Sequence, residues 1–214
     1  MKKIKIIYED KYIIVVNKDS GVLSIGNDKN PYDSLYSYVK DYVKSKNKNN
    51  KIFIVHRLDK DTCGLMVFAK SEEVKIKLQN NWDNVIRKYY AVVHGSISSY
   101  MNIESYLKEN KMLYTYSSNS GDYAHTEVFK VKSNSKYSLV DIRIYTGRKN
   151  QIRVHLSENG YPIVGDKKYG VKDGSKTMLL IAYYLEFIHP ITKELLTLKL
   201  DIPSDYLKYF KSRD

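Results

Sequence analysis

Short apolar runs with alternating or β-branched residues recur along most of the chain, a pattern typical of β-strands. Residues 3–6 alternate, and residues 12–16 form a β-branched run that suits a strand covered on both faces, with a turn at 9–11 between them. The same pattern predicts further strands at residues 52–55, 64–69, 89–93 and 137–145, and from residue 179 onward. Strands therefore dominate the predicted structure.

Helices are predicted where capping residues precede apolar positions at helical spacing. The first is expected to begin with Asn30 as its cap and Pro31 in the first helical position. Its buried stripe recurs at i, i+3, i+4 and i+7, at Leu35, Tyr38, Val39 and Tyr42. Ser71 is expected to cap a second helix, and residues 151–159 a third that ends at Gly160.

The remaining segments are polar loops and turns. Residues 44–51 are a cationic loop by composition, and both a solvated loop and a phosphate-contacting loop fit that composition. Ser204 is expected to cap a short terminal helix. Since there is no repeat, long linker or break in composition, we predict one α+β domain over residues 1–214. Its central sheet is expected to be mixed but mostly antiparallel, and flanked by helices and loops.

The net charge suggests the kind of partner. The 214 residues contain 36 Lys and Arg against 24 Asp and Glu, a net charge of +12, and 43% of them are hydrophobic. Such hydrophobic content excludes a disordered basic tail. A folded protein with this charge favours a phosphate-rich polymer such as nucleic acid, although a biased genome composition would also enrich lysine and tyrosine.

Cysteine and histidine usage argues against disulfides and metal sites. The single cysteine, Cys63, cannot form an internal disulfide or a paired-cysteine zinc site, and the five histidines lack ligand spacing. No apolar stretch approaches the roughly 18 residues of a membrane span, and no signal peptide is indicated. We therefore expect a cytoplasmic protein with no metal and no membrane association.

Reactive side chains beside glycines concentrate in four segments, at residues 56–64, 87–91, 146–155 and 165–170. Taken alone, each has an ordinary explanation. Asp59 beside Arg57 fits a surface ion pair, and Tyr89 fits packing on a strand. Arg148 and Arg153 fit solvated cations beside a helix. Cys63 fits a small residue in a turn better than a nucleophile.

Residues 56–65 (HRLDKDTCGL) closely resemble the motif of the RluA-like pseudouridine synthases that carries their catalytic aspartate. Other family motifs are similar to residues 6–18, 89–95, 146–170 and 180–190, in the same order along the chain. The resemblance implies the pseudouridine synthase fold, with an active-site cleft across the sheet. It also implies an enzyme that isomerises specific uridines of ribosomal or transfer RNA, with no cofactor and no obligate protein partner, and acting as a monomer.

The resemblance assigns roles to individual residues. Asp59 is implied as the catalytic carboxylate, Arg153 as the cation that keeps it anionic, and Tyr89 as the ring that stacks on uracil. Leu180 is implied to line the pocket, and Arg57 to fill the space left by the flipped nucleotide. Four further residues are implied to contact the substrate: His56, Arg148, Asn150 and Gln151.

The sequence departs from the family pattern at a few positions. They are Asp19 for the usual proline, Cys63 for serine, Arg87 for lysine, and Asn150 and Ile181 for histidines. Asn150 can still donate and accept hydrogen bonds, but it cannot titrate near neutral pH. Many members of the family carry an additional N-terminal RNA-binding module. Because Met1 lies only a few residues before the first predicted strand, we expect no such module here.

Two other functions fit parts of the sequence. An RNA chaperone could keep the fold without the chemistry, but Asp59, Tyr89 and Arg153 would then have no purpose. A nucleoside hydrolase or glycosidase would need a second carboxylate, for which Asp166 or Asp141 are the candidates. Asp166, however, lies in a Gly-Asp-x-x-Tyr-Gly turn that resembles a structural element. Attack by Asp59 on the sugar, addition to the ring, and proton abstraction all remain open as routes.

Overall fold

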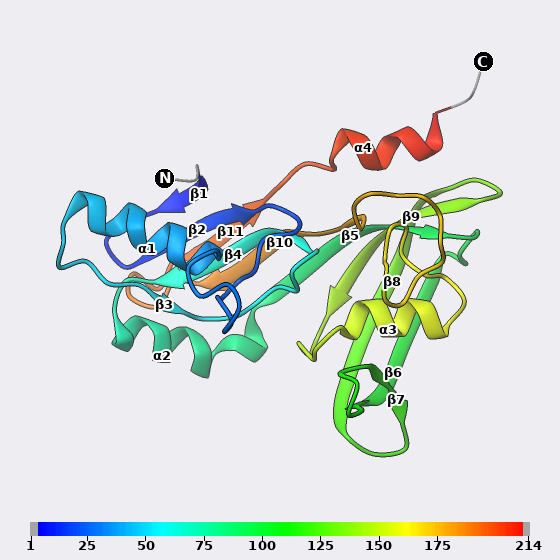
Figure 1. Ribbon diagram of the computed structural model, residues 1–214, viewed down its shortest axis with the longest axis horizontal. Helices are drawn as coiled ribbons and strands as arrows, with labels where there is room; N and C mark the ends of the chain where they lie inside the picture. Colours follow the sequence, from blue (N-terminus) through cyan, green and yellow to red (C-terminus); the bar gives the residue numbers. More distant parts are fainter. Residues whose placement is uncertain (1–3, 212–214) are drawn as a thin grey trace. The chain divides into compact units, whose positions relative to one another are not determined.

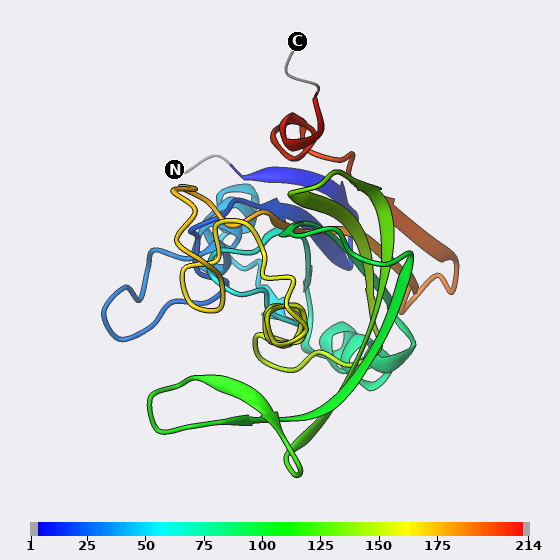
Figure 2. The ribbon, with the colours of Figure 1, turned by 90° about the vertical axis from the view of Figure 1, so that its right-hand side faces the viewer.

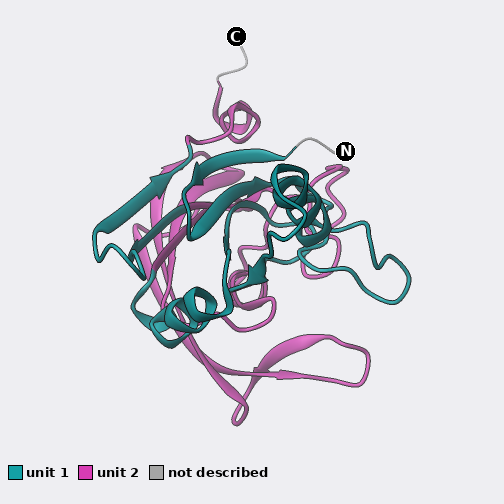
Figure 3. Cartoon of the chain, turned by 90° about the vertical axis from the view of Figure 1, so that its left-hand side faces the viewer, with its two compact units in different colours: residues 1–85, 184–200 teal, residues 86–183, 201–214 magenta. Residues whose placement is uncertain are grey.

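A computed structural model describes residues 4–211 of the chain (Figure 1). Its internal contacts divide it into two compact units (Figure 3). Unit 1 consists of residues 1–85 and 184–200, and unit 2 of residues 86–183 and 201–214. Lys3, the first residue of the first predicted strand, lies outside the described residues. No helix among the described residues has the length and apolar character that crossing a membrane requires.

Four pairs of strands in unit 1 are antiparallel. β2 pairs with β1 on one side and β4 on the other, and β3 also pairs with β4. The strands are β1 (Lys5–Glu9), β2 (Ile13–Lys18), β3 (Phe53–Ile54), β4 (Cys63–Ala69), β11 (Leu195–Lys199) and, from residue 184, β10 (Leu180–Ile188). The predicted strands at the start of the chain and at 64–69 are thus confirmed, with bounds shifted by a few residues.

The predicted start of the first helix is wrong. Helix α1 (Leu35–Lys46) begins after Ser34, whose Oγ accepts a hydrogen bond from the Ser37 backbone N–H at 3.3 Å. Asn27 and Asn30 instead exchange backbone hydrogen bonds in the preceding loop. The helix begins after Ser34 because its side chain accepts a hydrogen bond from a free backbone N–H of the first turn. The Asn-Pro pair does not begin the helix. The helix also runs three residues into the predicted 44–51 loop.

Unit 1 also contains helix α2 (Glu72–Asn80) and the short 3-10 helix η1 (Trp82–Asn84). Ser71 caps α2 through a hydrogen bond from the Val74 backbone N–H, which confirms the predicted cap. β2 has the alternating core pattern of a strand covered on both faces. Ile14 and Val16 belong to the apolar cluster that includes α1, and Ile13 and Val15 to the cluster that includes α2.

Unit 2 is built on an antiparallel sheet with the strand order β5-β9-β8-β6-β7. Its strands are β5 (Ile86–His94), β6 (Tyr100–Glu109), β7 (Thr115–Ser118), β8 (Asp122–Ser133) and β9 (Tyr137–Ile144), with the first residues of β10. Figure 2 shows β6 and β7 joined at the tip of a long hairpin. All registers described in both units are antiparallel, and helices accompany the strands, which confirms the predicted α+β class.

The helices of unit 2 are α3 (Gln151–Glu158), α4 (Ser204–Leu207) and the 3-10 helix η2 (Lys208–Phe210). The predicted helix at 151–159 is confirmed, and Gly160 follows it with a positive φ of 85°. The predicted cap at Ser204 is wrong, because Ser204 is already helical and Pro203 holds the cap position without a side-chain hydrogen bond.

Glu9 joins β1 to α1 and to Lys70, the residue after β4, through a network of hydrogen bonds. Its carboxylate lies 2.8 Å from Lys70 Nζ, 3.0 Å from Lys46 Nζ and 2.8 Å from Tyr42 Oη. Burial would raise the pKa of Glu9, but these three partners outweigh it and lower the pKa to about 2. Because the unfolded value is about 4.3, the network stabilises the fold above that pH and loses its effect as the pH falls toward 2.

We expect Glu9→Gln to lower the free energy of unfolding at pH 6, and this loss to shrink steadily below pH 4. Urea unfolding of both proteins between pH 2.5 and pH 7 measures it. Glu73→Gln is the control, because the Glu73 pair with Lys77 is an exposed i, i+4 pair of small worth. A loss that is as large at pH 2.5 as at pH 6 would contradict the role of Glu9.

Candidate active site

Asp59 lies in a tight turn of unit 1 between β3 and β4. The Thr62 backbone N–H donates to the Asp59 carbonyl oxygen at 3.2 Å, which closes the turn around Lys60 and Asp61. Asp59 is half-buried, whereas Lys60 and Asp61 are exposed. The turn therefore fixes the backbone that carries the predicted catalytic carboxylate.

The segment after β2 holds this turn in place. Ser24 Oγ accepts from the Leu58 N–H at 3.1 Å and donates to the Leu58 carbonyl at 2.6 Å. The Gly21 N–H donates to the carbonyl of residue 60 at 3.0 Å, and Ser20 Oγ to that of Asp61 at 2.8 Å. Gly21 has a φ of 81°, a conformation that favours glycine.

Lys18 places a buried ammonium against the same turn. It is fully buried, and its Nζ donates to the carbonyls of Asp19, Val22 and Lys60 at 3.1, 2.7 and 2.8 Å. Burial lowers the pKa of Lys18 to about 8, and neighbouring acidic groups, Asp59 among them, offset part of that effect. The turn that carries Asp59 thus has a cation within its own unit. Lys18 was not predicted as a site residue, because a lysine is rarely fully buried.

His56 and Arg57, which precede Asp59, differ in their surroundings. His56 Nε2 accepts a hydrogen bond from the Val67 N–H at 3.1 Å, and its ring stacks on Trp82 with centroids 4.5 Å apart. His56 therefore ties the turn to β4 and η1. Arg57 is exposed, and it makes no hydrogen bond or ion pair with any residue between 4 and 211. Its guanidinium is available to a ligand.

In unit 2, Arg153 of α3 forms a bidentate ion pair with Asp166. Arg153 Nε and Nη2 each lie 2.8 Å from one carboxylate oxygen, and only 8% of the arginine is exposed. The backbone N–H groups of Lys168 and Tyr169 also donate to this carboxylate. Burial would raise the pKa of Asp166, but Arg153 and the backbone donors outweigh it and lower the pKa.

Asn150 lies beside this pair at the start of α3. Its Oδ1 accepts from Arg153 Nη1 at 2.9 Å, and its Nδ2 donates to Tyr169 Oη at 3.1 Å and Thr115 Oγ1 at 3.3 Å. It adopts a left-handed conformation with a φ of 57°, which asparagine tolerates better than most residues. The structure thus brings two predicted site residues, Asn150 and Arg153, into direct contact.

Gln151 is buried, and its amide is fully hydrogen-bonded. Its Oε1 accepts from Thr146 Oγ1 at 2.7 Å and from the Arg148 N–H at 3.0 Å. Its Nε2 donates to the His125 carbonyl and to Thr126 Oγ1, both at 2.9 Å. Gln151 therefore fastens the turn before α3 to β8, while Arg148 itself is exposed.

Tyr89 and Leu180 occupy sheet positions of unit 2. Tyr89 is buried on β5, opposite Ile142 of β9, and Leu180 is the buried first residue of β10. Asp59 belongs to unit 1, and Arg153 to unit 2. The expected pairing of Asp59 with Arg153 and the expected cleft across the sheet stay predictions.

Asp166 has a role that was not predicted from the sequence, as the ion-pair partner of Arg153. As expected, it lies in a turn, where two backbone N–H groups donate to its carboxylate. The arginine partner was not foreseen, although the Asp-x-x-Tyr spacing could have indicated an acidic side chain turned back on its own backbone. Since Arg153 occupies both of its oxygens, Asp166 is poorly suited to be the second carboxylate of a glycosidase.

Comparison with known proteins gives consistent results. The family described as RNA pseudouridylate synthase matches residues 12–158. "Ribosomal large subunit pseudouridine synthase D" of Borreliella burgdorferi is 37% identical over 86% of this chain, which spans 60% of that protein. An uncharacterized RNA pseudouridine synthase of Bacillus subtilis is 30% identical over 98% of this chain and 76% of its own length. The human protein "RNA Pseudouridylate Synthase Domain Containing 4" matches in fold, with a TM-score of 0.78 at 23% identity over 95% of this chain and 90% of its own.

Proposed function

Because this chain belongs to the RNA pseudouridylate synthase family, we propose that it isomerises uridine to pseudouridine in RNA. The observation that carries this proposal is the family match over residues 12–158, which includes the motif around Asp59. The relative named for the ribosomal large subunit favours large-subunit ribosomal RNA as the substrate. Transfer RNA is the other substrate class that the test includes.

The reaction needs a carboxylate and no group from outside. The bond between uracil N1 and C1′ of ribose breaks, the ring turns, and C1′ bonds to carbon 5. Carbon 5 then loses its proton and N1 gains one, so that atoms and charge balance. We assign the carboxylate to Asp59, as nucleophile or as base. Support comes from its turn, which Ser24 and Lys18 hold through backbone hydrogen bonds, since a fixed carboxylate needs little reorganisation during bond exchange.

Other residues are assigned roles with different support. Arg57 is proposed to contact the RNA around the extruded nucleotide, and its exposed guanidinium supports this. The roles of Tyr89, Arg153 and Leu180 in stacking, charge and pocket lining are proposed from the resemblance alone. No cofactor enters the proposed reaction.

The function is tested with RNA labelled with tritium at carbon 5 of uridine. Unmodified transcripts of large-subunit ribosomal RNA and transfer RNA are incubated with the purified protein, and released tritium is counted. We expect release from the ribosomal transcript, at one or a few uridines that chemical mapping of pseudouridine identifies. No release from either class of RNA would contradict the proposed function.

Tyr89→Phe is expected to keep the affinity for RNA and to lower the rate of tritium release about tenfold. The phenyl ring retains stacking, whereas the lost hydroxyl removes a group that can assist proton transfer. Single-turnover rates measure the effect. Tyr137→Phe, on β9, is the control and should react at the normal rate. A normal rate for Tyr89→Phe would leave its hydroxyl without a role in the reaction.

A further inference from the structure

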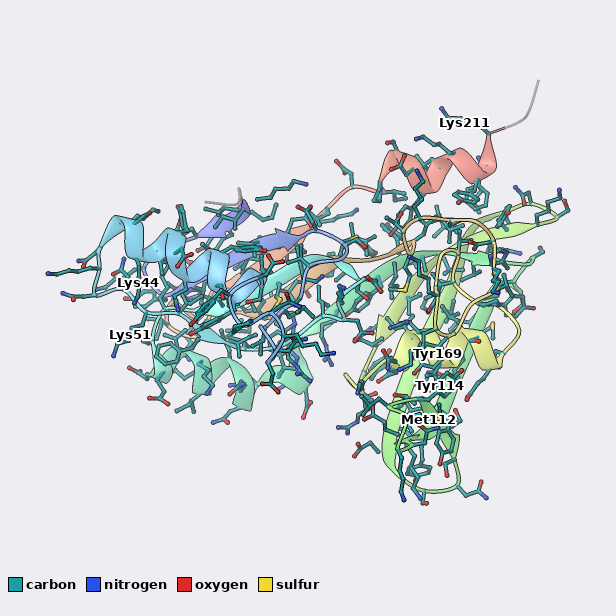
Figure 4. The ribbon with its side chains drawn as sticks, in the orientation of Figure 1. Lys44, Lys51, Met112, Tyr114, Tyr169 and Lys211 are labelled. Atoms are coloured by element: carbon teal, nitrogen blue, oxygen red, sulfur yellow. The ribbon has the colours of Figure 1, made fainter. Side chains whose placement is uncertain are left out.

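Unit 1 contains a groove between α1 and β3, away from the turn that carries Asp59. Its volume is about 480 Å³. Four lysines line it: Lys40 and Lys44 from α1, Lys51 from the segment before β3, and Lys75 from α2. Figure 4 shows Lys44 near the end of α1 and Lys51 below it. We call this feature the α1–β3 groove.

The four lysines of the α1–β3 groove carry uncompensated charge. Among residues 4–211, none of them has a carboxylate within ion-pair distance. Two other lysines nearby behave differently, since Lys46 and Lys70 both pair with Glu9. A concave surface with several unpaired cations concentrates positive potential and attracts an anion.

The floor of the groove is apolar. Tyr36 and Phe53 are half-buried there, Ile52 is buried, and Ile25 at the edge is 38% exposed. A small inorganic anion would use the lysines but leave these side chains uncovered. A duplex would offer phosphates but no free base face. An unpaired nucleotide segment satisfies both parts, because its bases can lie on aromatic side chains and its phosphates on lysines.

We propose that the α1–β3 groove binds an unpaired segment of the RNA, separate from the uridine that reacts. The choice of RNA rather than another polyanion rests on the proposed function. One continuous RNA strand can reach both the α1–β3 groove and Asp59, because only five residues lead from Ile54 of β3 to Asp59. Their α-carbons are therefore at most about 18 Å apart. The groove would hold the flanking strand while the target uridine reacts.

Binding is tested with a variant in which the four groove lysines are replaced: Lys40→Gln, Lys44→Gln, Lys51→Gln and Lys75→Gln. The matched control removes the same charge from exposed positions elsewhere: Lys130→Gln, Lys132→Gln, Lys136→Gln and Lys199→Gln. The probe is a fluorescein-labelled oligouridylate of 12 nucleotides, measured by anisotropy at several salt concentrations. Melting temperatures check that both variants fold.

We expect the groove variant to bind the oligouridylate at least about tenfold more weakly, and the control less than about threefold more weakly. Oligouridylate with 4-thiouridine should cross-link to Tyr36 or Phe53 on irradiation. Phe53→Leu, which keeps all four lysines, should reduce both the affinity and the cross-link. Equal affinity of the groove and control variants, or cross-links confined to other residues, would overturn the proposal.

The tritium assay separates this proposal from the proposed function. With ribosomal RNA as the substrate, the groove variant should have a higher KM than the unaltered protein. Its kcat should change much less than its KM. If the unaltered protein isomerises uridine and the groove variant has the KM of the control, the groove proposal fails alone. If the unaltered protein binds the oligouridylate through the groove but releases no tritium from any RNA, the proposed isomerase function fails and the groove proposal stands.

Discussion

Asp59→Asn is expected to lower tritium release from uridine-labelled RNA by at least about a thousandfold. Asparagine has the shape of aspartate, but it can neither attack carbon nor accept a proton at neutral pH. The local fold should persist, because the hydrogen bonds that hold the turn use the backbone of residues 58, 60 and 61. The loss should therefore fall on the chemical step.

RNA affinity separates a chemical role of Asp59 from a structural one. It should stay within a few-fold of the unaltered protein in Asp59→Asn, because phosphate contacts from lysine and arginine supply most of it. The control is Asp28→Asn, which removes an exposed carboxylate from the same unit and should react normally. Tritium release that persists in Asp59→Asn would rule out this carboxylate as the catalytic group.

Asp166→Asn is expected to lower the free energy of unfolding by about 3 kcal/mol. The substitution leaves the buried Arg153 guanidinium facing a neutral amide, and it weakens the bonds from the Lys168 and Tyr169 backbone. The loss of this buried, bidentate ion pair dominates the decrease. Urea unfolding at pH 7 measures it.

A double-mutant cycle isolates the ion pair. Arg153→Met alone leaves the buried Asp166 unpaired, whereas Arg153→Met with Asp166→Asn removes both charges. The double variant should therefore lose clearly less than the sum of the two single variants. Since the pair lowers the pKa of Asp166, its stabilising effect should be complete at neutral pH and fade as the pH falls below about 4. Additive losses in the cycle would show that the pair contributes little.

Apolar patterning was sufficient for the strands that form the cores. β2 and β4 are nearly continuous apolar runs, and both are buried on two faces, so their signal is strong. The alternation in β9 likewise matches its burial, with Val140, Ile142 and Ile144 inside. At these positions, local propensity and burial agree.

The strands β6 to β8 were not predicted, because little of their surface is buried. Ile103 and Leu107 of β6, and Ala124 and Val128 of β8, are their main buried apolar residues. Pairing between polar strands stabilises the rest, as between Tyr106 and Tyr123, whose rings lie 5.9 Å apart. When a strand is stabilised by its partner strand rather than by a buried face, its sequence pattern predicts it only weakly.

The candidate site, like the fold, was predicted only in part from the sequence. The motif around Asp59 identified the family, since the order and spacing of its residues are specific. The motif did not, however, predict the contacts that join site residues far apart in the sequence. Lys18 contacts the carbonyl of residue 60, and Arg153 contacts Asp166, over 42 and 13 positions of sequence. Such contacts depend on the folded topology and not on any local pattern.

The polypeptide passes between the two compact units three times, after residues 85, 183 and 200. Neither unit is therefore encoded by one uninterrupted stretch of the gene. A fragment that stops at residue 183 lacks Leu185, Phe187 and Leu198, which share an apolar cluster with Val15 and Val67 from the first strands. Truncation far downstream thus strips side chains from a core that starts near the N-terminus, and no single cut yields either unit intact.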